Sequence, residues 1–152
     1  MSLRNRLDQD LMDAMRNRDV LRRSVLRLLR SAIQNEEIEK QTALDDDGII
    51  AVLAHQARQR RESIDAFAKG GRQDLVEKEK SELALLLEYL PEQMSGEEIT
   101  GLLQQAIDET GATGPQDLGK VMGLVMPQVK GKAEGGEVGS IASKLLKALA
   151  DS

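Results

Sequence analysis

The apolar residues of this chain recur at helical spacing along its whole length. Leu3, Leu7, Leu11 and Met15 predict a first amphipathic helix. A second helix is expected from Asp19, a suitable N-cap, to about residue 39, with one apolar side formed by Leu21, Val25, Leu28, Leu29 and Ala32. No segment shows the sustained period-two alternation that is typical of a half-buried strand. The pattern therefore predicts an all-α protein.

Capping and turn residues place the later helices. Asp45, Asp46 and Asp47 are expected to open a third helix, because acids at a helix start accept hydrogen bonds from free backbone N–H groups. A metal site is the alternative, but the three acids lack the spaced ligands of a calcium loop. Gly70 and Gly71 are expected to end the third helix. Proline, glycine and a capping box at Ser95 then predict four more helices, at about residues 73–90, 95–110, 115–129 and 138–149.

The LPEQMS segment, residues 90–95, separates two regions of different composition. The 62 residues from Pro91 onward contain 14 charged side chains and most of the glycines, whereas 33 of the first 90 residues are charged. We expect a bundle or hairpin of long helices over residues 1–92 and a small three-helix domain over residues 93–152.

Composition removes several classes of function. The chain has no cysteine, which excludes disulfides, thiolate metal sites and cysteine nucleophiles. One tyrosine, one phenylalanine and no tryptophan argue against modules that stack bases on aromatic rings. The net charge is −5, so no overall field attracts nucleic acid. Residues 1–31, however, hold eight arginines against four aspartates.

Three of these arginines share one side of the second predicted helix. Arg23, Arg27 and Arg30 lie within about 60° of one another at 100° per residue. Such a row can follow a phosphate backbone without reading base sequence. The alternative is an ordinary solvated helix face.

Charged residues also interrupt the apolar stripes of the third and fourth helices. Arg61 projects into one stripe with Arg60 at its edge, and Glu79 projects into the other with Glu82 at its edge. A hairpin turning at residues 70–71 brings these positions opposite one another. Because an unpaired buried charge is costly, we predict an interhelical ion-pair cluster that sets the hairpin's register. The alternative is that the arginines bind a ligand.

No catalytic residues, metal ligands or cofactor site can be assigned. His55 is the only histidine, and the glycine–lysine pairs lack the spacing of a phosphate-binding P-loop. Gly119 and Gly123 predict close helix packing. The turn at residues 131–136, with Lys120, Lys130 and Lys132 nearby, suits anions, although a purely structural turn is the alternative.

The sequence predicts no membrane segment, since its apolar runs are far shorter than a bilayer requires. It also opens without the apolar region of a secretory signal peptide. We therefore expect a cytoplasmic location.

Several segments, in order along the chain, resemble the YqeY family: AMRNRD, LRLLRSAI, RQRRESIDAF, GGRQDL, EYLPEQMS and GKVMGLVMPQVKGKAEG. That family is similar to the C-terminal tail of GatB, a subunit of the tRNA-dependent amidotransferase, where the tail helps to hold the tRNA. The resemblance implies a helical bundle, a smaller helical domain and tRNA or another RNA as partner. It implies no amidotransferase activity, because the catalytic centres lie outside the tail. The family usually reads G-R-A-D-G where this chain has GKAEG at residues 131–135, and lysine lacks arginine's planar fork.

The leading hypothesis is a non-catalytic, tRNA-associated helical module that uses Arg23, Arg27, Arg30, Lys120, Lys130 and Lys132. The competing hypothesis is a protein–protein adaptor without affinity for nucleic acid. A third is an accessory to an amide-transfer complex, a carbon–nitrogen ligase that uses glutamine as donor.

Overall fold

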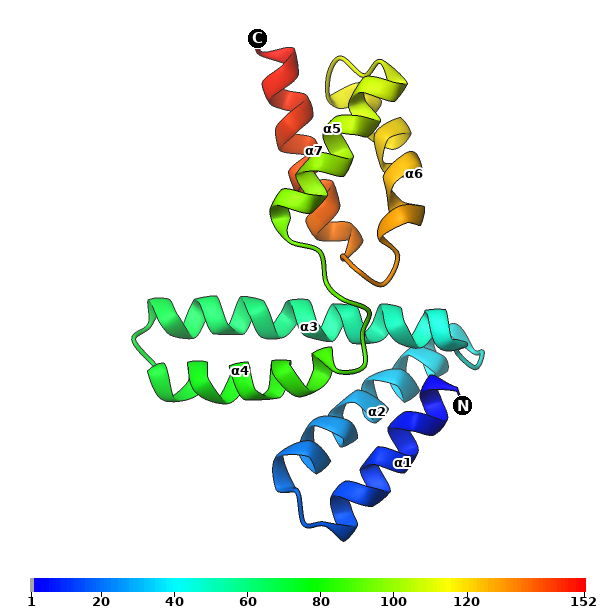
Figure 1. Ribbon diagram of the computed structural model, residues 1–152, viewed down its shortest axis with the longest axis vertical. Coiled ribbons are helices and arrows are strands. Elements are labelled where there is room, and N and C mark those ends of the chain that lie inside the picture. The colour runs from blue at the N-terminus through cyan, green and yellow to red at the C-terminus, as the bar shows by residue number, and fades with distance from the viewer. Residues whose placement is uncertain (1) are drawn as a thin grey trace. The chain divides into compact units, whose positions relative to one another are not determined.

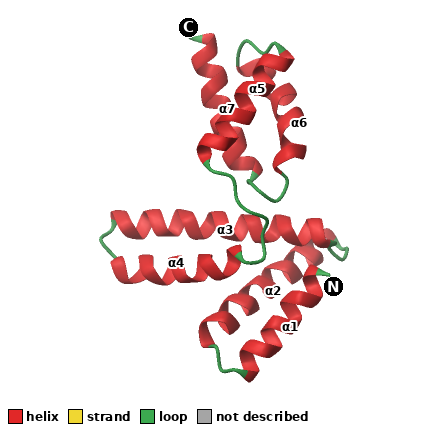
Figure 2. Cartoon of the chain, in the orientation of Figure 1, coloured by secondary structure: helices red, strands yellow, loops and turns green. Residues whose placement is uncertain are grey.

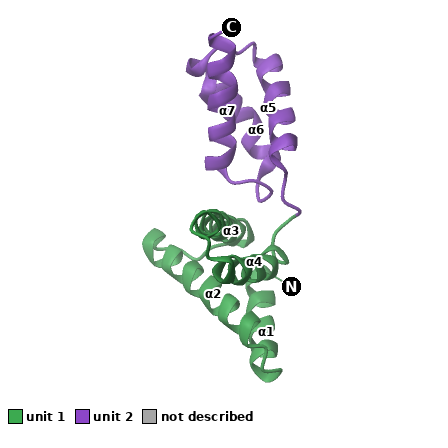
Figure 3. Cartoon of the chain, turned by 90° about the vertical axis from the view of Figure 1, so that its left-hand side faces the viewer, with its two compact units in different colours: residues 1–91 green, residues 92–152 purple. Residues whose placement is uncertain are grey.

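The computed structural model describes residues 2–152, and every regular element within them is helical (Figure 2). The chain divides into two compact units, residues 1–91 and 92–152, so the division falls inside the LPEQMS segment (Figure 3). The all-α fold class predicted from the sequence is confirmed. No helix within residues 2–152 combines the length and apolar character needed to cross a bilayer.

Two antiparallel helical hairpins make up the first unit (Figure 1). The helices are α1 (Leu3–Arg16), α2 (Val20–Lys40), α3 (Asp46–Lys69) and α4 (Gln73–Leu87). Side-chain caps start the first three, with Ser2, Asp19 and Asp45 each accepting a backbone hydrogen bond from the residue three positions on. Asp46, the second acid of the aspartate run, accepts a hydrogen bond from the Leu3 amide at 3.1 Å. The aspartates therefore serve helix termini.

The core of the first unit is aliphatic and lies where the two hairpins meet. Its α2 contribution differs from the sequence prediction, because the buried residues are Val25, Leu26, Leu29 and Ile33. Leu28, expected on the apolar side, is 53% exposed, and Leu21 is exposed as well. Met15 of α1 is likewise half exposed. Helix α2 carries more apolar residues than one face can bury, and its contacts with α1, α3 and α4 select which of them are covered.

Tyr89, the only tyrosine, ties the end of α4 to both helices of the other hairpin. Its hydroxyl donates a hydrogen bond to Asp10 at 2.6 Å, and the Arg6 guanidinium lies 4.6 Å from its ring centre. The neighbouring Glu88 accepts a hydrogen bond from Arg22 of α2 at 2.8 Å. Burial, together with the Asp10 carboxylate, raises the pKa of Tyr89 to about 12. Helix α4 ends at Leu87, three residues before the predicted end. Tyr89 therefore lies beyond the helix, with its side chain in the core.

The α3–α4 hairpin encloses an ion-pair cluster centred on Arg60. Arg60 is only 8% exposed, and its Nη1 donates to Glu82 and, at 3.4 Å, to Glu79. Glu82 is buried and Glu79 is half-buried. The structure thus brings together Arg60, Glu79 and Glu82, with Arg60 and not Arg61 on the buried stripe. The sequence pattern places Arg61 and Glu79 within the apolar stripes and Arg60 and Glu82 at their edges. In both helices the edge residue is the more buried of the two.

The second unit is a three-helix bundle with its own core. Its elements are α5 (Gly96–Thr110), a 3₁₀ turn (Pro115–Asp117), α6 (Leu118–Val129) and α7 (Gly135–Ala150). The predicted capping box is confirmed, because Ser95 and Glu98 exchange side-chain and backbone hydrogen bonds. The single helix predicted over residues 115–129 is instead a 3₁₀ turn followed by α6. Valine, leucine, isoleucine and alanine side chains from all three helices fill the core.

We expect Arg60→Leu to lower the free energy of unfolding by about 3–5 kcal/mol, because Glu82 is left buried without its partner. Arg61→Leu, the matched control on the same turn, should cost less than about 1 kcal/mol. The double variant Arg60→Leu/Glu82→Leu should recover most of the loss. Urea unfolding measures all three, and equal costs at positions 60 and 61 would contradict the assignment.

Tyr89→Phe should lower stability by about 1–2 kcal/mol, because it removes the hydrogen bond to Asp10. The folded pKa lies above the unfolded one, so the stability that Tyr89 contributes is complete below pH 10 and lost as pH rises toward 12. Since this is the only tyrosine, phenolate absorbance follows it directly. Titration of the native protein near pH 10 would contradict a buried, acid-paired hydroxyl.

Candidate nucleic-acid interface

The three arginines singled out on the second helix lie on one side of α2, away from its buried stripe. Arg27 and Arg30 are exposed, while Arg23 is half-buried, with an Nε that has no hydrogen-bond partner among residues 2–152. The neighbouring Arg22 differs, since it is engaged by Glu88 and by Asp19. The Arg22 guanidinium is held in these ion pairs, whereas Arg27 and Arg30 are exposed and Arg23 buries its Nε.

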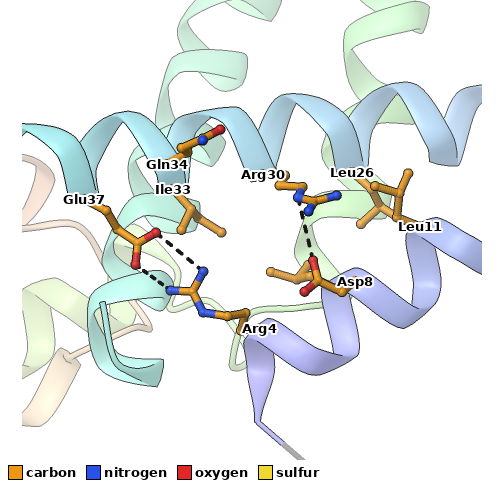
Figure 4. Close-up of a pocket in the computed structure, with 9 residues that line it drawn as sticks. Arg4, Asp8, Leu11, Leu26, Arg30, Ile33, Gln34 and Glu37 are labelled. Atoms are coloured by element: carbon orange, nitrogen blue, oxygen red, sulfur yellow. Dashed lines mark hydrogen bonds and ion pairs between the residues drawn. The ribbon is translucent and has the colours of Figure 1, made fainter. Parts of the chain in front are cut away.

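A pocket of about 290 Å³ opens beside this row, between α1 and α2 (Figure 4). Arg30 belongs to both the row and the pocket, where its Nε lies 3.9 Å from a carboxylate oxygen of Asp8. The pocket has an apolar wall from both helices and a charged rim; its residues are Arg4, Leu7, Asp8, Leu11, Leu26, Arg30, Ile33, Gln34 and Glu37. The row therefore leads to a concavity of mixed apolar and charged character.

Arg4 and Glu37 form the other end of the pocket rim. The Arg4 guanidinium meets the Glu37 carboxylate at 2.6 and 3.5 Å and also donates to the Leu44 carbonyl. Glu37 in turn accepts a hydrogen bond from the Leu44 amide at 2.8 Å. This backbone hydrogen bond, followed by the one from Arg4, lowers the pKa of Glu37. Glu37 is thus an ionised acceptor that three N–H donors already engage.

Sequence reasoning did not identify this pocket. Arg4 and Asp8 stand one helical turn apart in the first predicted helix, and that spacing places them on one face. Their partners Glu37 and Arg30 lie 33 and 22 residues further along the chain. Only the α1–α2 packing brings the four side chains together, so no local pattern could indicate the site.

The lysines predicted for the second unit do not form a single cluster. Lys120 lies in the first turn of α6 with its Nζ 3.9 Å from Asp117, while Lys130 follows the last turn of that helix. Ten residues of helix separate the two by roughly 15 Å. Lys132 is exposed in the next turn, and its carbonyl accepts a hydrogen bond from the Met94 amide at 2.9 Å. Lys130 and Lys132 are close in sequence, and Lys120 stands apart.

The prediction that Gly119 and Gly123 allow close helix packing is wrong. Both glycines are exposed, and a Cβ added at either position would meet nothing within 4 Å. Helix α6 packs through Val121, Val125 and Val129 instead. The glycines leave a smooth outer surface beside Lys120.

Residues 2–152 contain no group of three or more histidine, aspartate or glutamate side chains placed to hold a metal ion. His55 is an exposed residue of α3. The charged groups that the structure gathers in the first unit are arginines and their carboxylate partners, whose chemistry is the binding of anions and of hydrogen-bond donors.

Comparison with known proteins gives a match over nearly the whole chain. The family model described as Yqey-like protein matches residues 4–146. Similar proteins include "Altered inheritance of mitochondria protein 41, mitochondrial" of Eremothecium gossypii, 40% identical over 55% of this chain and 46% of that protein. The protein of that name from Kluyveromyces lactis is 43% identical over 55% and 45%. That of Pyrenophora tritici-repentis is 31% identical over 84% and 71%.

These matches concern the compartment in which the relatives work and the share of their length that this chain covers. The expected cytoplasmic location is contradicted, because the relatives are named as mitochondrial proteins. The features behind that expectation, short apolar runs and a charged opening stretch, do not distinguish the cytoplasm from the interior of an organelle. The matched stretch spans about half the length of the first two relatives.

We expect Gly123→Ala to stabilise the second unit by about 0.5–1 kcal/mol, because alanine is the better helix former and its methyl meets only open space. Gly119→Ala, in the first turn, should stabilise by less. Thermal unfolding of the two variants checks this. A loss of stability would show that the outer face of α6 is covered within the folded chain.

Proposed function

From the premise that this chain belongs to the Yqey-like protein family, we propose that it is a non-catalytic helical module that binds tRNA through its first unit. The similarity to the tRNA-holding tail of GatB is part of that family. The match covers the chain's helical elements, and it supports a binding role without supplying a catalytic centre.

The observation that carries the proposal is the row formed by Arg23, Arg27 and Arg30. The three side chains span about 10 Å along α2, on a face that the core does not use. Guanidinium groups in such a row bind phosphate oxygens in forked geometry and release condensed counterions, whatever the base sequence. Lys130 and Lys132 of the second unit supply further positive charge, as does Lys120 at a separate place on α6.

The protein–protein adaptor is the second candidate, and a separate observation favours it. Met12, Met15, Leu28 and Ile38 are large apolar side chains that are at least half exposed on the α1–α2 hairpin. Methionine adapts to varied apolar partners and is common at binding surfaces. A protein partner would cover these residues, whereas phosphate binding would leave them exposed.

We expect bulk tRNA to bind the full chain in a salt-dependent manner. In the variant Arg23→Ala/Arg27→Ala/Arg30→Ala, the slope of log affinity against log salt should fall by about 2–3, since each lost phosphate contact removes roughly 0.7–0.9. Fluorescence anisotropy across a salt series measures both proteins.

The matched control is Arg16→Ala/Arg58→Ala/Arg72→Ala, which removes the same charge from arginines of the first unit that pair locally with Asp13, Glu62 and Asp74. Its slope should change by less than 1. Equal slopes in the two triple variants would reduce the effect to net charge. No binding at low salt would reject the tRNA proposal and leave the adaptor, which Met12→Ser/Met15→Ser would then impair.

A further inference from the structure

We propose that the pocket between α1 and α2 receives an unpaired nucleobase bearing an exocyclic amino group, from RNA whose phosphates lie along Arg23, Arg27 and Arg30. This inference rests on the proposed function and specifies the part of the RNA that the first unit reads. It concerns the residues around Asp8 and Arg30, where the arginine row meets the pocket (Figure 4).

The size of the pocket favours a single ring system held between an apolar floor and a charged rim. Its volume of about 290 Å³ is at the lower end of the range for ligand pockets, which suits one ring system better than a larger molecule. Leu7 and Leu11 line it from α1, and Leu26 and Ile33 line it from α2. All four belong to the core and are at most 7% exposed, so they offer a base a small apolar floor. They offer nothing to a phosphate or a ribose hydroxyl.

The charged residues of the pocket favour a phosphate outside it and a base within it. Asp8 and Glu37 balance the charges of Arg4 and Arg30, so the pocket offers a phosphate no net positive charge, and the RNA backbone is expected to lie along Arg23, Arg27 and Arg30. Glu37 already accepts three hydrogen bonds, two from Arg4 and one from the Leu44 amide. The Asp8 carboxylate lies 3.9 Å from Arg30 Nε, which is too far for a hydrogen bond, so Asp8 retains acceptor capacity.

An acceptor that retains capacity selects a donor, and the donors on nucleobases include the exocyclic amino groups. An aspartate accepts well from the amino group of cytosine, for which uracil has a carbonyl oxygen that a carboxylate repels. In a duplex the amino group is paired and the base is stacked, so only an unpaired nucleotide can enter. Because no aromatic residue lines the pocket, Asp8 supplies most of the selectivity.

The test compares oligo(C) with oligo(U) of equal length, binding to the full chain at one salt concentration. These polymers carry the same backbone charge and the same ring size. We expect oligo(C) to bind about five- to tenfold more tightly, the discrimination typical of one hydrogen bond at a partly exposed site. In Asp8→Ala the ratio of the two affinities should fall to about one.

Asp13→Ala is the matched control, because it removes an acid from the same helix outside the pocket. Both variants should bind each oligomer somewhat more tightly through the lost negative charge, and only Asp8→Ala should lose the preference. Urea midpoints establish that both variants are folded.

The outcomes separate the two proposals. Equal binding of oligo(C) and oligo(U), or a preference that survives Asp8→Ala, overturns the base pocket while salt-dependent tRNA binding through α2 stands. Absence of any RNA binding overturns both.

Discussion

A buried arginine with two carboxylate partners fixes the architecture of the first unit. Arg60 could not lie 8% exposed on the packed face of α3 unless α4 presented Glu82 and Glu79 to it, so the α3–α4 hairpin has one permitted register. That register brings the end of α4 to α1 and α2, where Tyr89 meets Asp10 and Glu88 meets Arg22. With Arg22 held in this way, α2 exposes Arg27 and Arg30 and leaves Arg23 half-buried beside them.

Local chemistry in the sequence predicted the helices well and their buried faces less well. The caps Asp19, Asp45 and Ser95 start helices where expected, because a side chain three residues from its backbone partner acts without tertiary help. The faces of α2 and α3 were turned by about one residue, exposing Leu28 and burying Arg60 in place of Arg61. The neighbouring helices decide which edge of an apolar stripe is buried. The periodicity of a single helix holds no information about those neighbours.

The same limit applies to the candidate site. The arginine row was visible because its members belong to one helix. The pocket beside it was not, since it joins α1 to α2 through side chains more than 20 residues apart. The prediction of a cytoplasmic location was wrong for a different reason. Composition describes the folded chain and carries no information on the compartment in which the chain works. The proposed function therefore takes its class of partner from the resemblance to the tRNA-holding tail of GatB and its surface from the arginine row on α2.

The most direct test of tRNA binding by α2 is the footprint of tRNA on the protein, read from backbone amide NMR shifts as tRNA is added to the full chain. We expect the largest changes in the first unit on residues 23–34 of α2 and on the facing residues 4–11 of α1. The α3–α4 turn around Gly70 should be unaffected. Shifts that spare α2, or that centre on the exposed methionines and Ile38, would contradict phosphate binding by the arginine row.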